Sequence, residues 1–122
     1  MRFSLLLYGL YLKLKAAARK NPVFQKYVSG VRLKVLIKTA DGKQGRLFIF
    51  DRGKILSRGG AGASDFDVAI VWSDAATGYK VMLSASDEES FKAAAQGKLR
   101  VEGMAYYAQW FTEGVKLAVS RK

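Results

Sequence analysis

The chain has 122 residues, with no cysteine and no histidine, and a formal net charge of +11. This length fits one domain. The two missing residue types exclude disulfides, thiolate nucleophiles, cysteine or histidine metal ligands, and histidine as a general base. We therefore expect a single domain over residues 1–122, with N-terminal helices over 1–30 and a sheet with covering helices over 31–122. We expect no enzymatic activity, no metal site and no cofactor.

The first segment, residues 1–20, is predicted to be a helix. Apolar residues with helical spacing form one face of it, namely Phe3, Leu6, Leu7, Leu10 and Leu14. The other side is apolar too, with Leu5, Tyr8 and Leu12. We expect the first face to pack in the core, whereas the second either packs as well or contacts a membrane surface or a protein partner. The apolar run is too short to span a bilayer.

A short second helix and three strands follow. Asn21 is a suitable cap and Pro22 a suitable first residue for a helix that reaches Ser29 and ends at Gly30. Residues 31–38 then alternate with period two, which predicts a strand with a basic outer face. Asp41-Gly42 and Arg52-Gly53 are turn signals that lead into strands over 44–51 and 54–58.

The basic charge is concentrated in this first half of the chain. Residues 1–58 carry 14 Lys or Arg and 2 Asp or Glu, whereas residues 59–122 carry 7 and 8. A one-sided positive field attracts anionic lipid or nucleic acid, and the alternative is a solvated surface that only aids solubility. We predict a membrane-docking face that includes Arg32, Lys34, Lys38, Arg46 and Lys54.

The second half of the chain alternates helices with two further strands. Residues 67–73 form a nearly continuous apolar run, which predicts a strand buried on both faces. Residues 75–83 indicate a helix, with a strand as the alternative. Ser86 and Glu89 form a capping box for a helix that ends near Gly97. Residues 98–102 predict a fifth strand and 104–113 a last helix, which residues 115–119 either extend or follow as a strand.

This order predicts an α+β domain, with one sheet covered on one face by helices. Four stretches in this order resemble the sterol-carrier-protein-2 (SCP2) family: Gly45–Phe50 with Gly53–Ile55, Asp65–Ser73, Ser86–Phe91 and Gly97–Gly103. The resemblance implies a five-stranded, mainly antiparallel sheet whose helices enclose an apolar tunnel. It also implies a protein that binds or carries a fatty acid, a sterol-like molecule, a phospholipid or an isoprenoid. An accessory role beside a lipid-modifying enzyme is one form that this function takes.

Apolar side chains beyond the needs of a core are available to line such a tunnel. The predicted lipid-binding residues are Phe48, Phe50, Ile70, Trp72, Val81, Met82, Leu83, Phe91, Met104, Tyr107, Trp110 and Phe111. For each of them, ordinary core packing is the alternative.

Location and partners are predicted less directly. Ser120-Arg121-Lys122 is not the peroxisomal tripeptide of some relatives, so we expect a cytoplasmic protein, with peripheral binding to the inner membrane as an option. Nucleic acid is the competing partner, because Lys43–Phe50 faintly resembles an RNA-binding strand motif. The order of helices and strands argues against that fold.

Overall fold

The computed structural model describes residues 2–84 and 86–119, so the C-terminal tripeptide Ser120–Lys122, which was predicted not to be a peroxisomal signal, lies outside the described residues. The elements, in chain order, are α1 (Arg2–Lys20), α2 (Pro22–Val28), β1 (Arg32–Thr39), β2 (Gly45–Asp51), β3 (Lys54–Gly59), β4 (Val68–Trp72), α3 (Ala75–Ser84), α4 (Asp87–Ala95), β5 (Leu99–Gly103) and α5 (Ala105–Val119). Residues 75–83 are thus helical, as predicted, and residues 115–119 extend the last helix.

The five strands form one sheet in the order β3-β2-β1-β4-β5. Three of the four neighbouring pairs are antiparallel, and β1 with β4 is parallel. The expected five-stranded, mainly antiparallel sheet is therefore confirmed.

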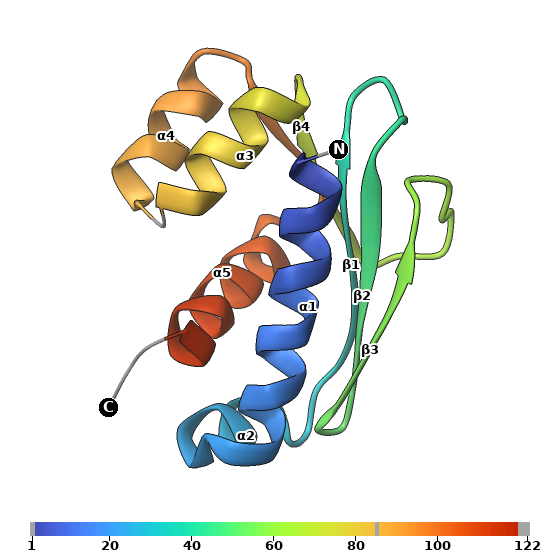
Figure 1. Cartoon of the computed structure of the whole chain (residues 1–122), viewed down its shortest axis with the longest axis vertical. Coiled ribbons are helices and arrows are strands. Elements are labelled where there is room, and N and C mark those ends of the chain that lie inside the picture. The colour runs from blue at the N-terminus through green and yellow to red at the C-terminus, as the bar shows by residue number, and fades with distance from the viewer. Residues whose placement is uncertain (1, 85, 120–122) are drawn as a thin grey trace.

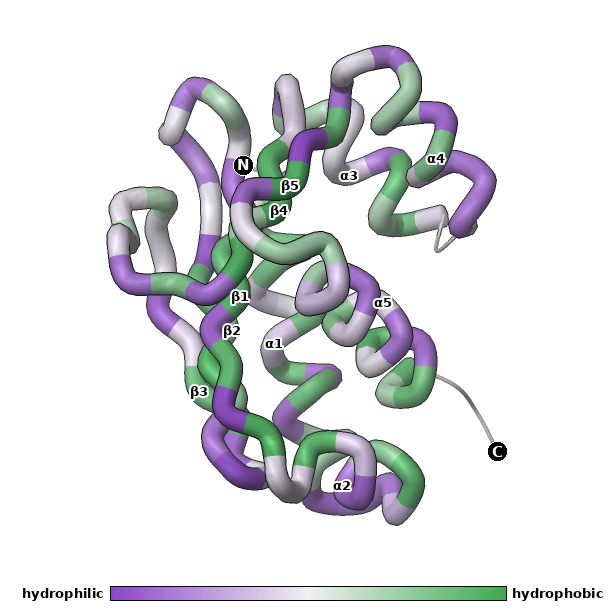
Figure 2. Tube along the Cα trace, turned by 180° about the vertical axis from the view of Figure 1, so that it is seen from behind, coloured by the Kyte–Doolittle hydropathy of each residue, from purple (hydrophilic) through white to green (hydrophobic). Residues whose placement is uncertain are grey.

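The helices lie on one face of this sheet (Figure 1). Helix α1 runs along the sheet with α5 beside it, α2 lies at one end, and α3 and α4 form a pair at the other end. Figure 2 shows the molecule from behind, coloured by hydropathy. Apolar and polar residues largely alternate along β1, whereas β4 is apolar throughout.

Local signals explain where several elements begin and end. The Asn21 side chain accepts hydrogen bonds from the backbone N–H groups of Val23 and Phe24, which caps α2. Ser86 Oγ accepts from the N–H of Glu89 at 3.2 Å and caps α4. Arg52 and Gly53 both have positive φ angles (48° and 94°), as a tight hairpin turn between β2 and β3 needs.

One expected helix end is different. The C-cap of α2 is Ser29, in a right-handed helical conformation, and its N–H bonds to the carbonyl of Lys26. Gly30 is not among the described residues with positive φ, so the left-handed glycine cap expected there does not form.

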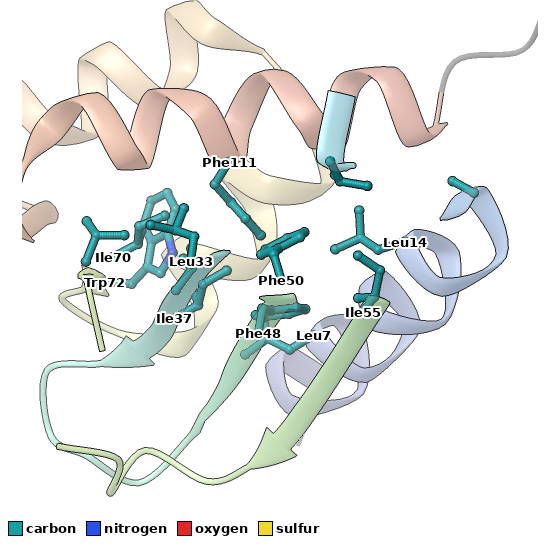
Figure 3. Close-up of a cluster of buried hydrophobic side chains, with 14 of the residues drawn as sticks. Leu7, Leu14, Leu33, Ile37, Phe48, Phe50, Ile55, Ile70, Trp72 and Phe111 are labelled. Carbon is teal, nitrogen blue, oxygen red and sulfur yellow. The ribbon is translucent and has the colours of Figure 1, made fainter. Parts of the chain in front are cut away.

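The main core lies between the sheet and the helices (Figure 3). We call it the inner cluster. Its buried members are Phe3, Leu7, Leu14, Ala17, Phe24, Val28, Leu33, Val35, Ile37, Phe48, Phe50, Ile55, Val68, Ile70, Trp72, Val81, Ala93 and Phe111. A smaller outer cluster on the opposite face consists of Leu36, Leu47, Ala69 and Val71, with Ile49, Ala63 and Phe66 against it. Residues of β4 thus reach both clusters, which confirms its predicted burial on both faces.

Candidate functional site

The candidate site is the apolar interface between the sheet and the helices. Six of the predicted lipid-binding residues are buried in the inner cluster: Phe48, Phe50, Ile70, Trp72, Val81 and Phe111. Met82, Tyr107 and Trp110 are partly buried and pack against it. Residues from β2, β4, α3 and α5 therefore meet here, although they are far apart in the sequence.

Aromatic rings dominate the part of this interface beneath α5. The ring centroid of Phe111 lies 5.5 Å from that of Phe48 and 5.9 Å from that of Phe50. Phe50 also meets Trp110 edge to face at 5.0 Å. Such arrangements are favourable for aromatic pairs. Because Phe48 and Phe50 are covered in this way, they are not free to stack on bases, which removes the main structural argument for RNA binding.

Three predicted residues are not brought to the inner cluster. Leu83, Phe91 and Met104 are 60%, 75% and 59% exposed. Leu83 ends α3, Phe91 lies on α4 and Met104 precedes α5. Helical spacing identifies which residues share a face, but it does not tell whether that face has a partner in the fold.

The structure does not show the expected apolar tunnel among its described residues. Side chains of α1 occupy the space beneath the helices, with Phe3, Leu7 and Leu14 all buried. Packing of this face of α1 in the core is confirmed. The opposite face of the helix, with Leu5, Tyr8 and Leu12, is largely exposed.

The cover over the inner cluster is unevenly packed. Helix α1 buries four residues, namely Phe3, Leu7, Leu14 and Ala17. Helices α3 and α4, which we call the α3–α4 pair, together bury only Gly78, Val81 and Ala93. Segments with few buried contacts open at a lower free-energy cost than well-packed ones. Helix α5 buries only Phe111 and Gly114, so the α3–α4 pair and α5 are both sparsely packed parts of the cover.

An open pocket of about 500 Å³ lies where the first turn of α1 meets α3. It is lined by Arg2, Phe3, Ala75, Ala76, Tyr79 and Lys80. The Arg2 guanidinium lies 5.9 Å from the centre of the Tyr79 ring. This pocket thus has an apolar floor and two cationic side chains.

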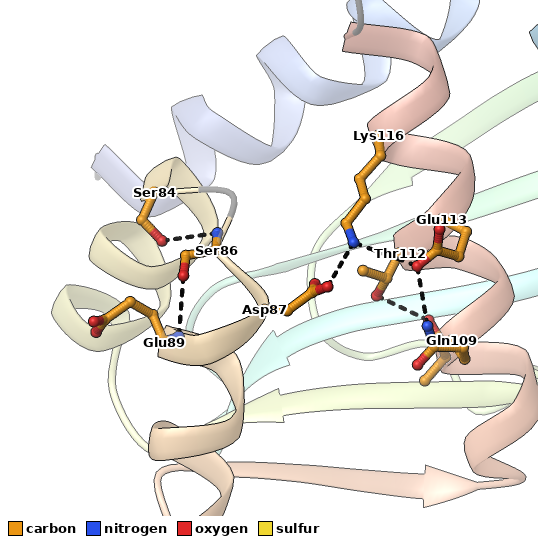
Figure 4. A network of polar contacts seen from close by, with 9 residues as sticks. Ser84, Ser86, Asp87, Glu89, Gln109, Thr112, Glu113 and Lys116 are labelled. Atoms are coloured by element: carbon orange, nitrogen blue, oxygen red, sulfur yellow. Dashed lines mark hydrogen bonds and ion pairs between the residues drawn. The ribbon is translucent and has the colours of Figure 1, made fainter.

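Tyr27 and Lys116 help to hold helix α5, in addition to the Asn21 side chain, which donates to the Leu117 carbonyl at 3.0 Å. Tyr27 of α2 stacks on Trp110 at 5.1 Å, and its hydroxyl donates to the Trp110 carbonyl at 2.8 Å. Burial, followed by nearby Glu113, raises the pKa of the Tyr27 hydroxyl above 10.0. On the other side, Lys116 Nζ contacts Asp87 of α4 at 2.7 Å (Figure 4). Its hydrogen bond to Asp87 raises the pKa of Lys116 above 10.5.

The predicted docking residues divide between the two faces of the sheet. The strand register places Arg32, Lys34, Lys38 and Lys54 on the outer face, together with Leu36. Lys34 Nζ contacts Asp65 at 2.6 Å, and Arg32 lies 3.9 Å from Asp51. An open pocket of about 340 Å³ borders both basic residues.

Arg46 differs from the other four and lies on the helical face. Its guanidinium is 5.1 Å from the centre of the Tyr8 ring and donates to Ser57 Oγ at 2.7 Å. A one-residue offset along β2 sends its side chain to the face opposite that of Leu47. Arg46 therefore does not share a face with the other four predicted docking residues, and membrane docking by those four stays a prediction.

Sequence reasoning missed two residues that shape the site. Gly78 was not predicted as a site residue, yet a Cβ built there would lie 2.8 Å from Phe3 and 2.9 Å from Trp72. Tyr27 drew no prediction, although it anchors α5. A glycine inside an apolar helical pattern was the available signal for the first, since close packing is a common reason to place one there.

Neither a metal-binding cluster nor a membrane-spanning helix is present among the described residues. Among residues 2–84 and 86–119, no group of three or more carboxylate side chains is arranged to hold a metal ion. Within the same ranges, no helix combines the length and the hydropathy needed to cross a bilayer.

Comparison with solved structures defines the class of fold. A structure described as a UbiJ-SCP2 ubiquinone synthesis protein matches with a TM-score of 0.67 at 17% identity, over 93% of this chain and 91% of that chain. A crystal structure of sterol carrier protein 2 matches with a TM-score of 0.64 at 16% identity, over 93% and 96% of the two chains. This chain therefore has the fold of an SCP2 sterol-binding domain, as its sequence resemblance predicted.

The same fold also occurs as part of a larger protein. The sec-alkylsulfatase Pisa1 from Pseudomonas sp. matches over 80% of this chain but only 14% of its own length, with a TM-score of 0.56 at 16% identity. No family model and no curated protein sequence matches the chain. The fold is thus established by structure, and the function has to be argued from the site.

Proposed function

We propose that this protein binds a lipid between the inner face of its sheet and its covering helices, and that it carries this ligand without transforming it. The observation that carries the proposal is the inner cluster, which gathers nine of the predicted lipid-binding side chains under a sparsely packed cover. A pocket that selects apolar ligands needs this kind of lining.

Movement of the α3–α4 pair gives the ligand its space. The interior is occupied by side chains, so a lipid enters only where the cover separates from the sheet. Val81 and Met82 then exchange contacts with the cluster for contacts with the ligand, at little net loss of apolar burial. Leu83 and Phe91 lie on the same pair and are exposed, which makes them available to the part of the lipid nearest the opening.

The names of similar structures support particular classes of ligand. One is a sterol carrier protein and another a ubiquinone synthesis protein. These names support a sterol-like or isoprenoid ligand for this chain, in addition to a fatty acid or phospholipid. An accessory role beside a lipid-modifying enzyme is part of the same proposal.

The first test is lipid uptake by the purified chain. Extraction with organic solvent followed by mass spectrometry is expected to find a co-purified lipid, and the delipidated protein is expected to bind a fatty acid or a quinone analogue. Met82→Lys places a charge against the inner cluster and is expected to weaken uptake at least about tenfold, because an unpaired buried charge is costly. Ala94→Lys, at an exposed position of α4, is the matched control and is expected to bind normally. A wild-type protein that takes up neither probe contradicts the proposal.

The docking surface that we propose for exchange with membranes is the exposed face of α1. Leu5, Tyr8 and Leu12 lie there, and Leu5 is 71% exposed. The helix carries five basic residues and no acidic one. Apolar residues beside basic ones suit the surface of an anionic bilayer. A protein partner that uses the same face is the alternative, and flotation with lipid vesicles distinguishes the two.

A further inference from the structure

Trp72 is a buried polar group that the fold leaves without a partner. It ends β4, where it lies between Thr39 of β1 and Leu99 of β5, and it is 3% exposed. Its ring belongs to the inner cluster (Figure 3). Of the buried side-chain nitrogen and oxygen atoms in the described residues, Trp72 Nε1 is the one without a hydrogen-bond partner.

The absence of a hydrogen-bond acceptor for the Trp72 N–H destabilises the folded protein and needs an explanation. The indole N–H can only donate, so it needs an acceptor. A buried donor without an acceptor costs about 1–3 kcal/mol. Thr39, its neighbour in the sheet and also buried, shows the ordinary solution: its hydroxyl donates to Asp41 at 2.7 Å and accepts from the N–H of Gln44 at 3.2 Å. Buried unpaired groups are rare in native proteins, and a functional role is one explanation for them.

The surroundings of Trp72 are those of the proposed ligand site. Gly78 of α3 lies directly on the indole, since a Cβ there would be 2.9 Å from Trp72 Cγ. The same Cβ would be 2.8 Å from Phe3, and Phe3 also lines the open pocket between α1 and α3. Trp72 is thus covered by the sparsely packed α3–α4 pair, close to an opening at the surface.

We propose that the Trp72 N–H is the polar anchor of the bound lipid and donates a hydrogen bond to an uncharged carbonyl oxygen of the ligand, such as that of an ester or a quinone. The members of the inner cluster around the indole are apolar, whereas the cations Arg2 and Lys80 line the open pocket outside that cluster. An ionised carboxylate buried beside the indole is therefore disfavoured. A neutral carbonyl accepts the bond without that penalty, and the apolar surroundings strengthen it. This inference rests on the proposed lipid-binding function and adds the chemical class of the ligand.

The test compares two probes that differ in the carbonyl group. Methyl palmitate and hexadecane are offered to the full-length protein from neutral phospholipid vesicles. Trp72→Phe keeps an aromatic ring and removes the donor, and it is expected to weaken binding of the ester about threefold to tenfold, with less than a twofold change for the hydrocarbon. Tyr106→Phe removes a polar hydrogen from an exposed aromatic residue outside the cluster, and it is expected to leave both affinities unchanged.

A measurement on the unmodified chain removes any dependence on how well the variants fold. The Trp72 indole N–H resonance, in protein labelled with nitrogen-15, is expected to shift downfield with methyl palmitate and not with hexadecane. Equal effects of Trp72→Phe on both probes, or an indole resonance that does not distinguish them, overturn the anchor while lipid binding stands. A wild-type protein that binds neither probe overturns both proposals.

Discussion

The absence of a side chain at Gly78 determines how closely α3 packs against α1 and β4. The closest atoms to a Cβ at this position belong to the rings of Phe3 and Trp72. Those two rings come from α1 and β4, so the absence of a side chain on α3 lets three elements meet at one point. Glycine costs a helix about 1 kcal/mol relative to alanine. In return for this cost, the backbone of α3 can lie in close contact with the Trp72 indole.

Gly78→Ala is therefore expected to destabilise the protein. The added methyl group forces apart rings that are already in contact, and overpacking of this kind costs about 1–3 kcal/mol. Gly9→Ala is the matched control, because Gly9 also lies inside a helix but has open space where its Cβ would be. That substitution is expected to stabilise the fold by about 0.5–1 kcal/mol. Urea unfolding of both variants measures the two signs, and a stabilised Gly78→Ala protein would contradict the packing argument.

At the scale of elements, α5 is the helix whose attachment depends most on titratable groups. Tyr27 and Lys116 hold it from opposite sides, through a tyrosine hydroxyl and an ammonium group. Both groups have pKa values raised by folding. A raised pKa means that the folded protein binds the proton more tightly than the unfolded chain does. The stability that these groups contribute is complete below about pH 10 and is lost as the pH rises through the raised values.

The expected outcome is an alkaline loss of stability that depends on Tyr27. Urea unfolding at a series of pH values is expected to show a free energy of unfolding that falls above about pH 10. Tyr27→Phe is expected to lose about 0.5–1.5 kcal/mol at neutral pH, with the hydrogen bond to the Trp110 carbonyl, and to fall less steeply at high pH. Tyr8→Phe, at a half-exposed tyrosine of α1, is expected to keep the wild-type profile. An unchanged alkaline slope in Tyr27→Phe would refute this account.

Elements could be predicted from the sequence to the extent that their signals are local. Period-two alternation located β1, and Asn21 and Ser86 located the starts of α2 and α4, because each of these signals acts within a few residues. The parallel pairing of β1 with β4 could not be predicted in this way, since it depends on closure of the chain over a long separation. The exposure of Phe91 was missed for a related reason, because a helix face becomes a core only when another element covers it.

For the candidate site, the residue types could be predicted from the sequence, but the distances and contacts between them could not. Phe50 and Phe111 were proposed as members of one lining, and the structure places their rings 5.9 Å apart. The unpaired N–H of Trp72 was out of reach, because a missing hydrogen bond is visible only when all neighbours are known. The side of the sheet taken by Arg46 depends on strand register in the same way.

At the scale of the whole molecule, the exposed face of α1 makes a prediction about membranes. The full chain is expected to float with vesicles that contain phosphatidylglycerol, and to do so less with vesicles of phosphatidylcholine alone or at high salt, since screening weakens its attraction to anionic lipid. Leu5→Glu, at an exposed position, is expected to reduce flotation without unfolding the protein. Gln96→Glu makes the same change of charge away from α1 and serves as control. Flotation unaffected by Leu5→Glu would exclude this face as the docking surface.

The strand order also determines how the sheet meets other copies of itself. The outermost strands are β3 and β5, and each is short. Lys54 and Arg58 on β3, and Arg100 on β5, are exposed cations. If a second copy added its β3 to this β3, like charges would face each other across the new ladder, which is unfavourable. The exposed cations on both edge strands thereby oppose edge-to-edge aggregation of the open sheet.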